Sequence, residues 1–186
     1  MVSSFFLFRC VIINWVMPMK LTFYVIVYGF LGFWLERVIN LIFMQRWYDN
    51  SVLYGPFQLM YGFGVVWSVV AYHTLKKLRL NRYLFWPLFL FLSIFGVGLS
   101  EYISGVMHEA IYGIVFWDYS KVFTVCHHPY VCILPTSIFG LLTVLTVILV
   151  HPFLERIILR IPKVVIGFSL VGMLINIVVT YLGVLL

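Results

Sequence analysis

The stretch Ser100–Ser120 gathers acidic and polar side chains within a chain that otherwise avoids them. Three of the six carboxylates lie here, on Glu101, Glu109 and Asp118. On a helix, Glu101, Gly105 and His108 share one face, and Glu109 lies on its flank. A carboxylate and an imidazole on one face can exchange protons or bind a cation. The alternative is that these residues form the ordinary polar rim of a helix end.

The end of the same stretch, Phe116–Ser120, mixes interfacial aromatic rings with a carboxylate and hydroxyl groups. Asp118, Tyr119 and Ser120 are therefore candidates for a substrate or cavity site. Asp118 could instead act only as the cap of the next helical segment. Both interpretations stay open from the sequence.

A second group of candidates lies on the first long apolar stretch, where Glu36 and Arg37 stand about two-thirds of the way along. A charge at membrane depth costs on the order of 3 kcal/mol, so it persists when it is paired or faces a polar cavity. Asn40 is one turn beyond Glu36 and shares its face. The residues either line a site or form an ion pair that fixes helix packing. Tyr61, beside Gly62, is a further cavity candidate.

The segment CHHPYVC, from Cys126 to Cys132, has the ligand types that zinc prefers. Its spacing argues against a metal site, because the adjacent His127 and His128 rarely both reach one ion and Pro129 stiffens the loop. We therefore predict no metal. A disulfide between Cys126 and Cys132 is the alternative if the compartment is oxidising. The residues do not identify a cofactor or assign a catalytic residue.

The composition places this chemistry in a membrane. Of 186 residues, 64% are hydrophobic and 10% charged, whereas soluble domains carry about a quarter charged residues. The net charge of +6 does not indicate nucleic-acid binding, because the basic residues lie between apolar stretches. Membrane lipid is thus the expected partner, and a homo-oligomer is left open.

Five apolar stretches of roughly the 20 residues needed to cross a hydrocarbon core predict transmembrane helices, because lipid-exposed backbone must be hydrogen-bonded within its own segment. They are Leu21–Phe43, Leu59–Leu75, Tyr83–Met107, Val131–His151 and Lys163–Leu186. The sequence therefore predicts an all-α, polytopic helix bundle forming one integral membrane domain over residues 1–186. Residues 1–19 are either an extra N-terminal helix or an interfacial segment. Gly55-Pro56 breaks the helix before the second stretch and indicates an element that re-enters the membrane.

The positive-inside rule orients the bundle in a cell membrane. With five spans, one side carries Arg9, Lys20, Lys76, Lys77, Arg79, Arg82, Arg156, Arg160 and Lys163, and the other only Arg46 and Lys121. We therefore predict that the N-terminal end of the first long span is cytoplasmic and the C-terminus lies outside. The basic run from Lys76 to Arg82 is interpreted as a cytoplasmic anchor, with a specific anionic-lipid site as the alternative.

Three segments together carry a resemblance to a known family. They are GFLGFWLERVIN, VLYGPFQLMYGFG, and EYISGVMHEAIYGIVFWDYS with the following span that ends in LVHPFLERI. The chain resembles the bacterial membrane family of ABC-transporter type IV, or CmpB-like, permeases over about Phe23–Ile157. The resemblance implies a membrane subunit that works with a separate ATPase. The chain departs from the family in having Asp49-Asn50-Ser51 before the segment around Tyr54-Gly55-Pro56, called the YGP element below, and in lacking an Asn and a Gly-Arg after WDYS.

Three functions compete on this evidence. The first is a permease-like subunit that moves a small solute or a lipid, which the resemblance favours. The second is a membrane enzyme that uses the carboxylates on a lipid or isoprenoid near the outer leaflet. The third is a small structural or assembly protein whose polar residues only pack helices. The chain has no P-loop motif and so cannot by itself be a P-loop ATPase.

Overall fold

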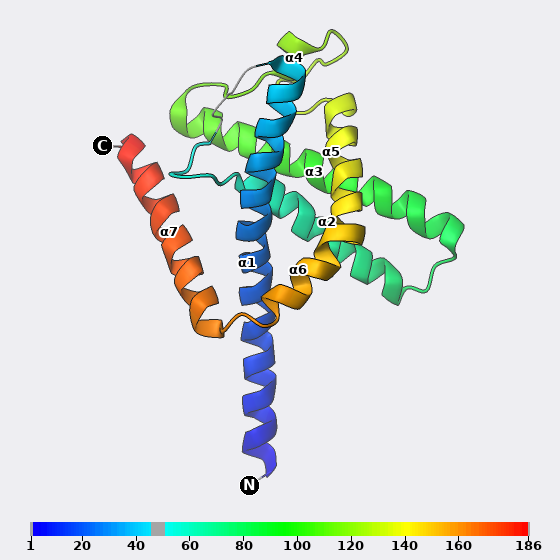
Figure 1. Ribbon diagram of the computed structural model, residues 1–186, viewed down its shortest axis with the longest axis vertical. Helices are drawn as coiled ribbons and strands as arrows, with labels where there is room; N and C mark the ends of the chain where they lie inside the picture. Colours follow the sequence, from blue (N-terminus) through cyan, green and yellow to red (C-terminus); the bar gives the residue numbers. More distant parts are fainter. Residues whose placement is uncertain (1, 46–50, 186) are drawn as a thin grey trace.

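The apolar stretches form helices, as predicted. A computed structural model describes residues 2–45 and 51–185, and within them every regular element is helical (Figure 1). In chain order these elements are α1 (Val2–Met44), α2 (Leu59–Lys77), α3 (Arg82–Tyr112), α4 (Tyr119–Val122), α5 (Ile133–Leu145), the π-helical turn η1 (Thr146–Val150), α6 (His151–Ile158) and α7 (Lys163–Leu185). The N-terminal segment continues into α1 rather than forming a separate helix.

Four helical segments in the described part of the chain are long and apolar enough to cross a membrane. They are Met19–Ile42, Arg82–Tyr112, Ile133–Ile158 and Lys163–Gly183. The prediction of a helical membrane bundle is therefore confirmed, with four such helices rather than five. The stretch predicted as the second span does form α2, but α2 carries Ser68, His73, Thr74 and two terminal lysines. It packs between α1 and α3, and side chains such as Phe63 and Trp67 stay exposed on its outer surface.

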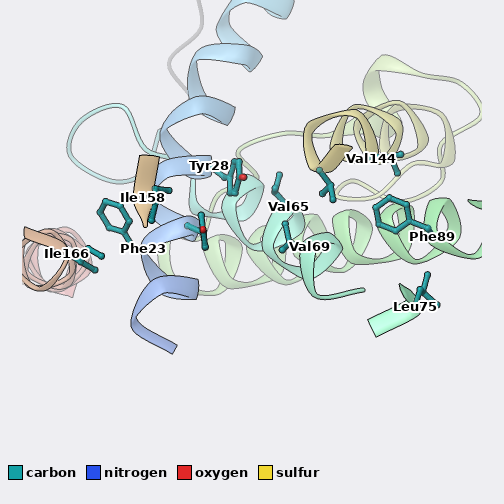
Figure 2. Close-up of a cluster of buried hydrophobic side chains, with 11 residues drawn as sticks. Phe23, Tyr28, Val65, Val69, Leu75, Phe89, Val144, Ile158 and Ile166 are labelled. Carbon is teal, nitrogen blue, oxygen red and sulfur yellow. The ribbon is translucent and has the colours of Figure 1, made fainter. Parts of the chain in front are cut away.

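The helices cross one another instead of lying in parallel (Figure 1). The antiparallel pair α2 and α3 crosses α1 steeply, α5 and α6 cover one side of that crossing, and α7 lies along the other side of α1. Side chains from α1, α2, α3, α5, η1, α6 and α7 form a shared apolar core (Figure 2). Phe89 of α3, completely buried, and Val147 of η1 are among its members. This core holds the helices in the arrangement that positions the polar residues described below.

The crossing of α1 and α2 depends on glycine. A Cβ at Gly62 would overlap the backbone carbonyl of Val25, and a Cβ at Gly32 would overlap the side chain of Tyr61. The two helices therefore approach closely because these positions carry no side chain. The crossing sets where Glu36, one turn beyond Gly32, stands relative to α2.

The YGP element is irregular and returns deep along α1. After α1 ends, residues 51–58 run back until the amide of Gln58 donates a 3.1 Å hydrogen bond to the carbonyl of Gly29. Gly29 lies 15 residues before the end of α1, or about 22 Å at the rise of an α-helix. The element thus reaches the middle of the first apolar span.

Asn176 of α7 satisfies part of the backbone of this irregular element. Its side-chain oxygen accepts from the Tyr54 amide at 3.1 Å, and its side-chain nitrogen donates to the Tyr54 carbonyl at 2.7 Å. Irregular backbone beside lipid needs such protein partners, because hydrocarbon supplies none. A single amide side chain thereby joins the last helix to the loop between the first two.

The helical run through α5 and α6 contains a π-helical turn at Thr146–Val150. Pro152 follows it, and proline has no N–H to donate and clashes with the carbonyl four residues earlier in an α-helix. The wider turn accommodates the proline. Beyond it, buried His151 lies against α1, where its Nδ1 is 2.7 Å from the Tyr28 hydroxyl.

Replacing Gly62 with alanine should destabilise the protein by about 1–3 kcal/mol, because the added methyl group would force α1 and α2 apart. The matched control is Gly172→Ala on α7, where an added Cβ meets nothing within 4 Å. Alanine there should be neutral or stabilising, since glycine costs a helix about 0.5–1 kcal/mol. Unfolding of both variants in the same detergent tests this. Equal stability of the two would contradict the close crossing.

Replacing Asn176 with leucine should lower the stability by about 1–3 kcal/mol, because it leaves an amide and a carbonyl of Tyr54 without their partner. Ser169→Ala is the control on the same helix, since the Ser169 hydroxyl donates to the Val165 carbonyl within α7. Thermal unfolding should separate the two variants. If Ser169→Ala lost as much stability as Asn176→Leu, the link to Tyr54 would have no specific role.

Candidate functional site: a buried carboxylate cluster

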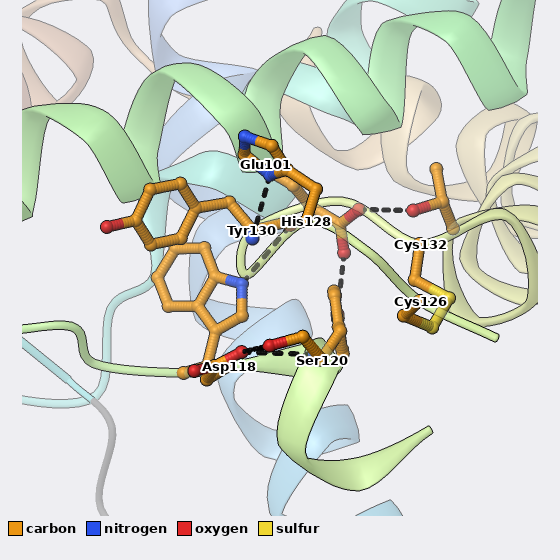
Figure 3. The surroundings of a disulfide bond; sticks show 10 residues. Glu101, Asp118, Ser120, Cys126, His128, Tyr130 and Cys132 are labelled. Atoms are coloured by element: carbon orange, nitrogen blue, oxygen red, sulfur yellow. Dashed lines mark hydrogen bonds between the residues drawn. A yellow bond between two sulfur atoms is a disulfide. The ribbon is translucent and has the colours of Figure 1, made fainter. Parts of the chain in front are cut away.

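Glu101 is the most deeply buried carboxylate among the described residues, with 2% of its surface exposed. It projects from α3 and accepts two hydrogen bonds. The Tyr119 hydroxyl donates to one carboxylate oxygen at 2.9 Å, and the Thr136 hydroxyl donates to the other at 2.7 Å (Figure 3). Three separate elements, α3, α4 and α5, thus meet at one carboxylate.

Glu36 and Tyr61 complete the cluster from the other side. The Tyr61 side chain of α2 hydrogen-bonds Glu36 of α1 and interacts electrostatically with Glu101 and Tyr119. Glu36 in turn lies close enough to interact electrostatically with Glu101. We call Glu36, Tyr61, Glu101, Tyr119 and Thr136 the carboxylate cluster. It joins two acidic groups and three hydroxyl groups from five helices.

Tyr119 reaches the cluster from the short helix α4. Burial, reinforced by the charge of Glu101 and the hydrogen bond to it, raises the pKa of Tyr119 well above its usual range. The phenol therefore stays protonated at physiological pH and remains a hydrogen-bond donor to Glu101. It cannot act as a base in this arrangement.

Asp118 begins α4 and acts as its cap. Its side chain accepts from the backbone amide of Ser120 at 3.0 Å and also bonds the Ser120 hydroxyl. The bond from the Ser120 hydroxyl contributes most to holding the pKa of Asp118 below its ordinary value. The amide bond and the Lys121 ammonium, at 3.2 Å, lower this pKa further. Asp118 and Ser120 therefore orient the helix that delivers Tyr119, in line with the capping interpretation of the sequence.

A disulfide between Cys126 and Cys132 closes the loop that follows α4 (Figure 3). Two backbone hydrogen bonds connect this loop to residues of the carboxylate cluster. The Tyr119 amide donates to the Pro129 carbonyl at 2.8 Å, and the Thr136 amide donates to the Cys132 carbonyl at 3.0 Å. The cross-link thus lies between the two residues that donate to Glu101.

Tyr130, inside this loop, packs directly on Gly105 of α3. A Cβ at Gly105 would overlap the Tyr130 ring, so the glycine makes room for the loop. The Tyr130 hydroxyl donates to Glu109, and this bond raises the pKa of Tyr130 to about 12. Its carbonyl accepts from the Trp117 indole at 3.3 Å. Glu109 thus helps to hold the loop and lies outside the carboxylate cluster.

His108 also lies apart from Glu101. Its Nε2 is 3.2 Å from the Tyr181 hydroxyl of α7, and its Nδ1 is 3.4 Å from the Ser104 hydroxyl. The Tyr130 ring packs on Gly105, which lies between Glu101 and His108 on the α3 face. The structure therefore links His108 to α7 rather than to the carboxylate.

The two remaining sequence candidates lie on α1 near Glu36. Arg37 is 6% exposed, and its guanidinium carbon lies 4.2 Å from the centre of the Phe33 ring. Asn40 is partly buried one turn beyond Glu36, and no hydrogen bond among the described residues joins it to the carboxylate cluster. Their assignment to a site stays a prediction.

Sequence reasoning missed Thr136, Tyr130 and Asn176. Thr136 follows a proline near the start of an apolar span, and Asn176 is an isolated amide in LINIVVT, so a polar residue in an apolar run was the available signal. In the part of the chain that the structure describes, no three His, Cys, Asp or Glu side chains gather as metal ligands.

The fold and the cluster define a class of protein: a multi-pass helical membrane protein with paired carboxylates held by hydroxyl groups between its helices. The family model described as "Putative ABC-transporter type IV" matches residues 23–183, most of the chain. The chain belongs to this family, which confirms the resemblance drawn from its motifs. No curated protein and no solved structure matches it. The family and the apolar helices make it a membrane component of the ABC-transporter type.

Replacing Thr136 with valine should cost about 1–3 kcal/mol of stability, because it removes a hydrogen bond to a buried carboxyl group while keeping the side-chain shape. Ser137→Ala is the control at the next position, outside the cluster's hydrogen bonds. Unfolding in detergent at neutral pH measures the difference. A Thr136→Val variant as stable as the control would mean that the bond to Glu101 contributes little.

Proposed function

We propose that the chain is the membrane subunit of a transporter that moves a small solute or a lipid with a positively charged group. The observation that carries the proposal is the burial of Glu101 beside Glu36 within a bundle of apolar helices. Two carboxylates at membrane depth are costly, and such residues mark substrate or ion pathways. An ammonium or similar cation is the kind of ligand that two carboxylates at one site would attract.

The hydroxyl groups of the cluster support recognition of a polar ligand as well as a charge. Tyr61, Tyr119 and Thr136 surround the carboxylates on different helices. A hydroxyl group can accept a hydrogen bond as well as donate one, so the cluster can bind an amine through several oxygens. The Tyr61 ring, 5.6 Å from that of Phe139, adds an aromatic wall.

The helix α4 offers a route by which a ligand could enter. It is only four residues long and lies between two irregular segments. A movement of α4 would withdraw Tyr119 from Glu101 without breaking a membrane-spanning helix. We infer that this segment controls access to the cluster.

The orientation and the partner are part of the proposal. We place the N-terminal end of the first long span in the cytoplasm and the C-terminus outside. The C-terminal end of α1, α4 and the C-terminus of α7 gather at one end of the molecule, and the α6–α7 connection lies toward the other (Figure 1). The disulfide supports an oxidising environment for the α4 end. A separate ATPase would then dock on the basic loops Lys76–Arg82 or Glu155–Lys163.

An enzyme that acts on a lipid or isoprenoid is the second candidate. The paired carboxylates and the donor Tyr119 also favour it, because acidic groups at a shared site can serve as general acid and base. This function would require chemical conversion of a bound lipid and would not require an ATPase.

Native mass spectrometry of protein extracted gently from its own membrane tests these functions. We expect a co-purifying ATPase subunit in the wild type and in Glu101→Gln, because the cluster lies away from the basic loops. A bound cationic ligand should be lost in Glu101→Gln and in Glu36→Gln. Glu109→Gln, which removes a carboxylate outside the cluster, should keep it. A converted lipid with no ATPase would favour the enzyme. Neither an ATPase nor a ligand in any sample would overturn the transporter proposal.

A further inference from the structure

We propose that the turn between α2 and α3 forms a binding site for the phosphate headgroup of an anionic phospholipid. A groove of about 260 Å³ lies at this turn. Three cationic side chains line it, those of Lys76, Arg79 and Arg82. The groove is separate from the carboxylate cluster, and the inference goes beyond the transport function proposed above.

The cations stand on a turn with a defined structure. The Lys76 ammonium lies 4.6 Å from the centre of the Tyr72 ring, which attracts it. Asn81 caps α3 by accepting from the Leu84 amide at 2.8 Å. The groove therefore presents its charges from a fixed frame, whereas a flexible basic tail would not.

Arg79 occupies a position that normally favours glycine. It follows the C-terminal cap of α2 and has a φ of 50°, in the left-handed region. Helices commonly end with glycine in this conformation, because other residues are strained there. An arginine at this position indicates that its side chain has a use that offsets the backbone strain. A phosphate is a suitable partner, because a guanidinium can bind two of its oxygens at once.

The carboxylates of the described residues leave the three cations available. The Asp118 carboxylate, for example, pairs with Lys121 at the α4 end of the molecule. Lys76, Arg79 and Arg82 are all exposed. An external anion is therefore the partner that their combined charge would attract.

The walls of the groove favour a lipid over a soluble anion. Phe85 and Trp86 of α3 line it together with the cations. Trp86 is 43% exposed, as expected of a ring at the interface between lipid and water. Beyond it, the membrane-spanning helix α3 continues with the exposed ring of Phe91. A headgroup bound at the cations would thus leave its acyl chains beside an apolar helix surface.

The test uses the full chain in nanodiscs of phosphatidylcholine with or without one-fifth phosphatidylglycerol. Native mass spectrometry counts the phosphatidylglycerol molecules that stay bound. The triple variant Lys76→Gln, Arg79→Asn, Arg82→Gln removes the three cations, and asparagine tolerates the left-handed backbone. The control removes three cations from the other basic loop, through Arg156→Gln, Arg160→Gln and Lys163→Gln.

We expect the first triple variant to retain phosphatidylglycerol about a hundredfold less well, since each cation near a membrane surface contributes a several-fold factor. The control should keep the bound lipid. Equal losses in both would indicate general surface attraction and overturn the site, and so would retention by both. Competition by inorganic phosphate alone would assign the groove to a soluble anion. Loss of a co-purifying protein with lipid retention unchanged would assign it to a partner subunit.

Arg79→Gly separates binding from folding. Glycine relieves the left-handed backbone at this position, so the variant should be at least as stable as the wild type in pure phosphatidylcholine. It should nevertheless lose about fivefold in phosphatidylglycerol retention. A stable Arg79→Gly variant that bound the lipid as well as the wild type would overturn the role of Arg79. A loss of stability without loss of lipid would assign Arg79 to the fold.

Discussion

The need to satisfy every polar group without water is the constraint on which this structure depends. In hydrocarbon an unpartnered polar group costs several kcal/mol, so a specific partner stabilises a polar residue within the bundle. Glu101 has the hydroxyls of Tyr119 and Thr136. The backbone of Tyr54 has Asn176, and His151 has Tyr28. Each of these pairs joins segments that are distant in the sequence, so the same bonds also determine which helices lie together.

Close approach is the second requirement, because hydrogen bonds between helices have a fixed reach. Gly62 lets α2 lie against the backbone of α1, which brings Tyr61 to Glu36. Gly105 performs the same role for the disulfide loop, where Tyr130 takes the space that a side chain would fill. A larger residue at either glycine would move a donor away from its carboxylate. The two glycines therefore affect the site by allowing the hydrogen-bond donors to lie close to the carboxylates.

The sequence predicted the helices better than the contacts between them. Length and hydropathy were sufficient for the apolar helices, and the helix break at Gly55-Pro56 was correctly placed. Charge in an apolar run identified Glu36 and Glu101. Glu101 and His108 share a helical face but have different partners, because Tyr130 lies on Gly105 between them, which helical spacing does not reveal. Thr136 and Asn176 escaped notice because one hydroxyl or amide in an apolar span becomes informative only when its distant partner is known.

The hydrogen-bond capacity of Glu101 connects its structural and functional roles. An ionised carboxylate offers about four acceptor positions on its two oxygens. Tyr119 and Thr136 use one on each oxygen, so the group has unused capacity in addition to its charge. The two hydroxyl bonds offset part of the cost of burial, and the nearby Glu36 adds a second acidic group. Two acidic groups held by hydroxyl donors can therefore exist between the helices. The same cluster offers acceptor oxygens to the cationic ligand that we propose.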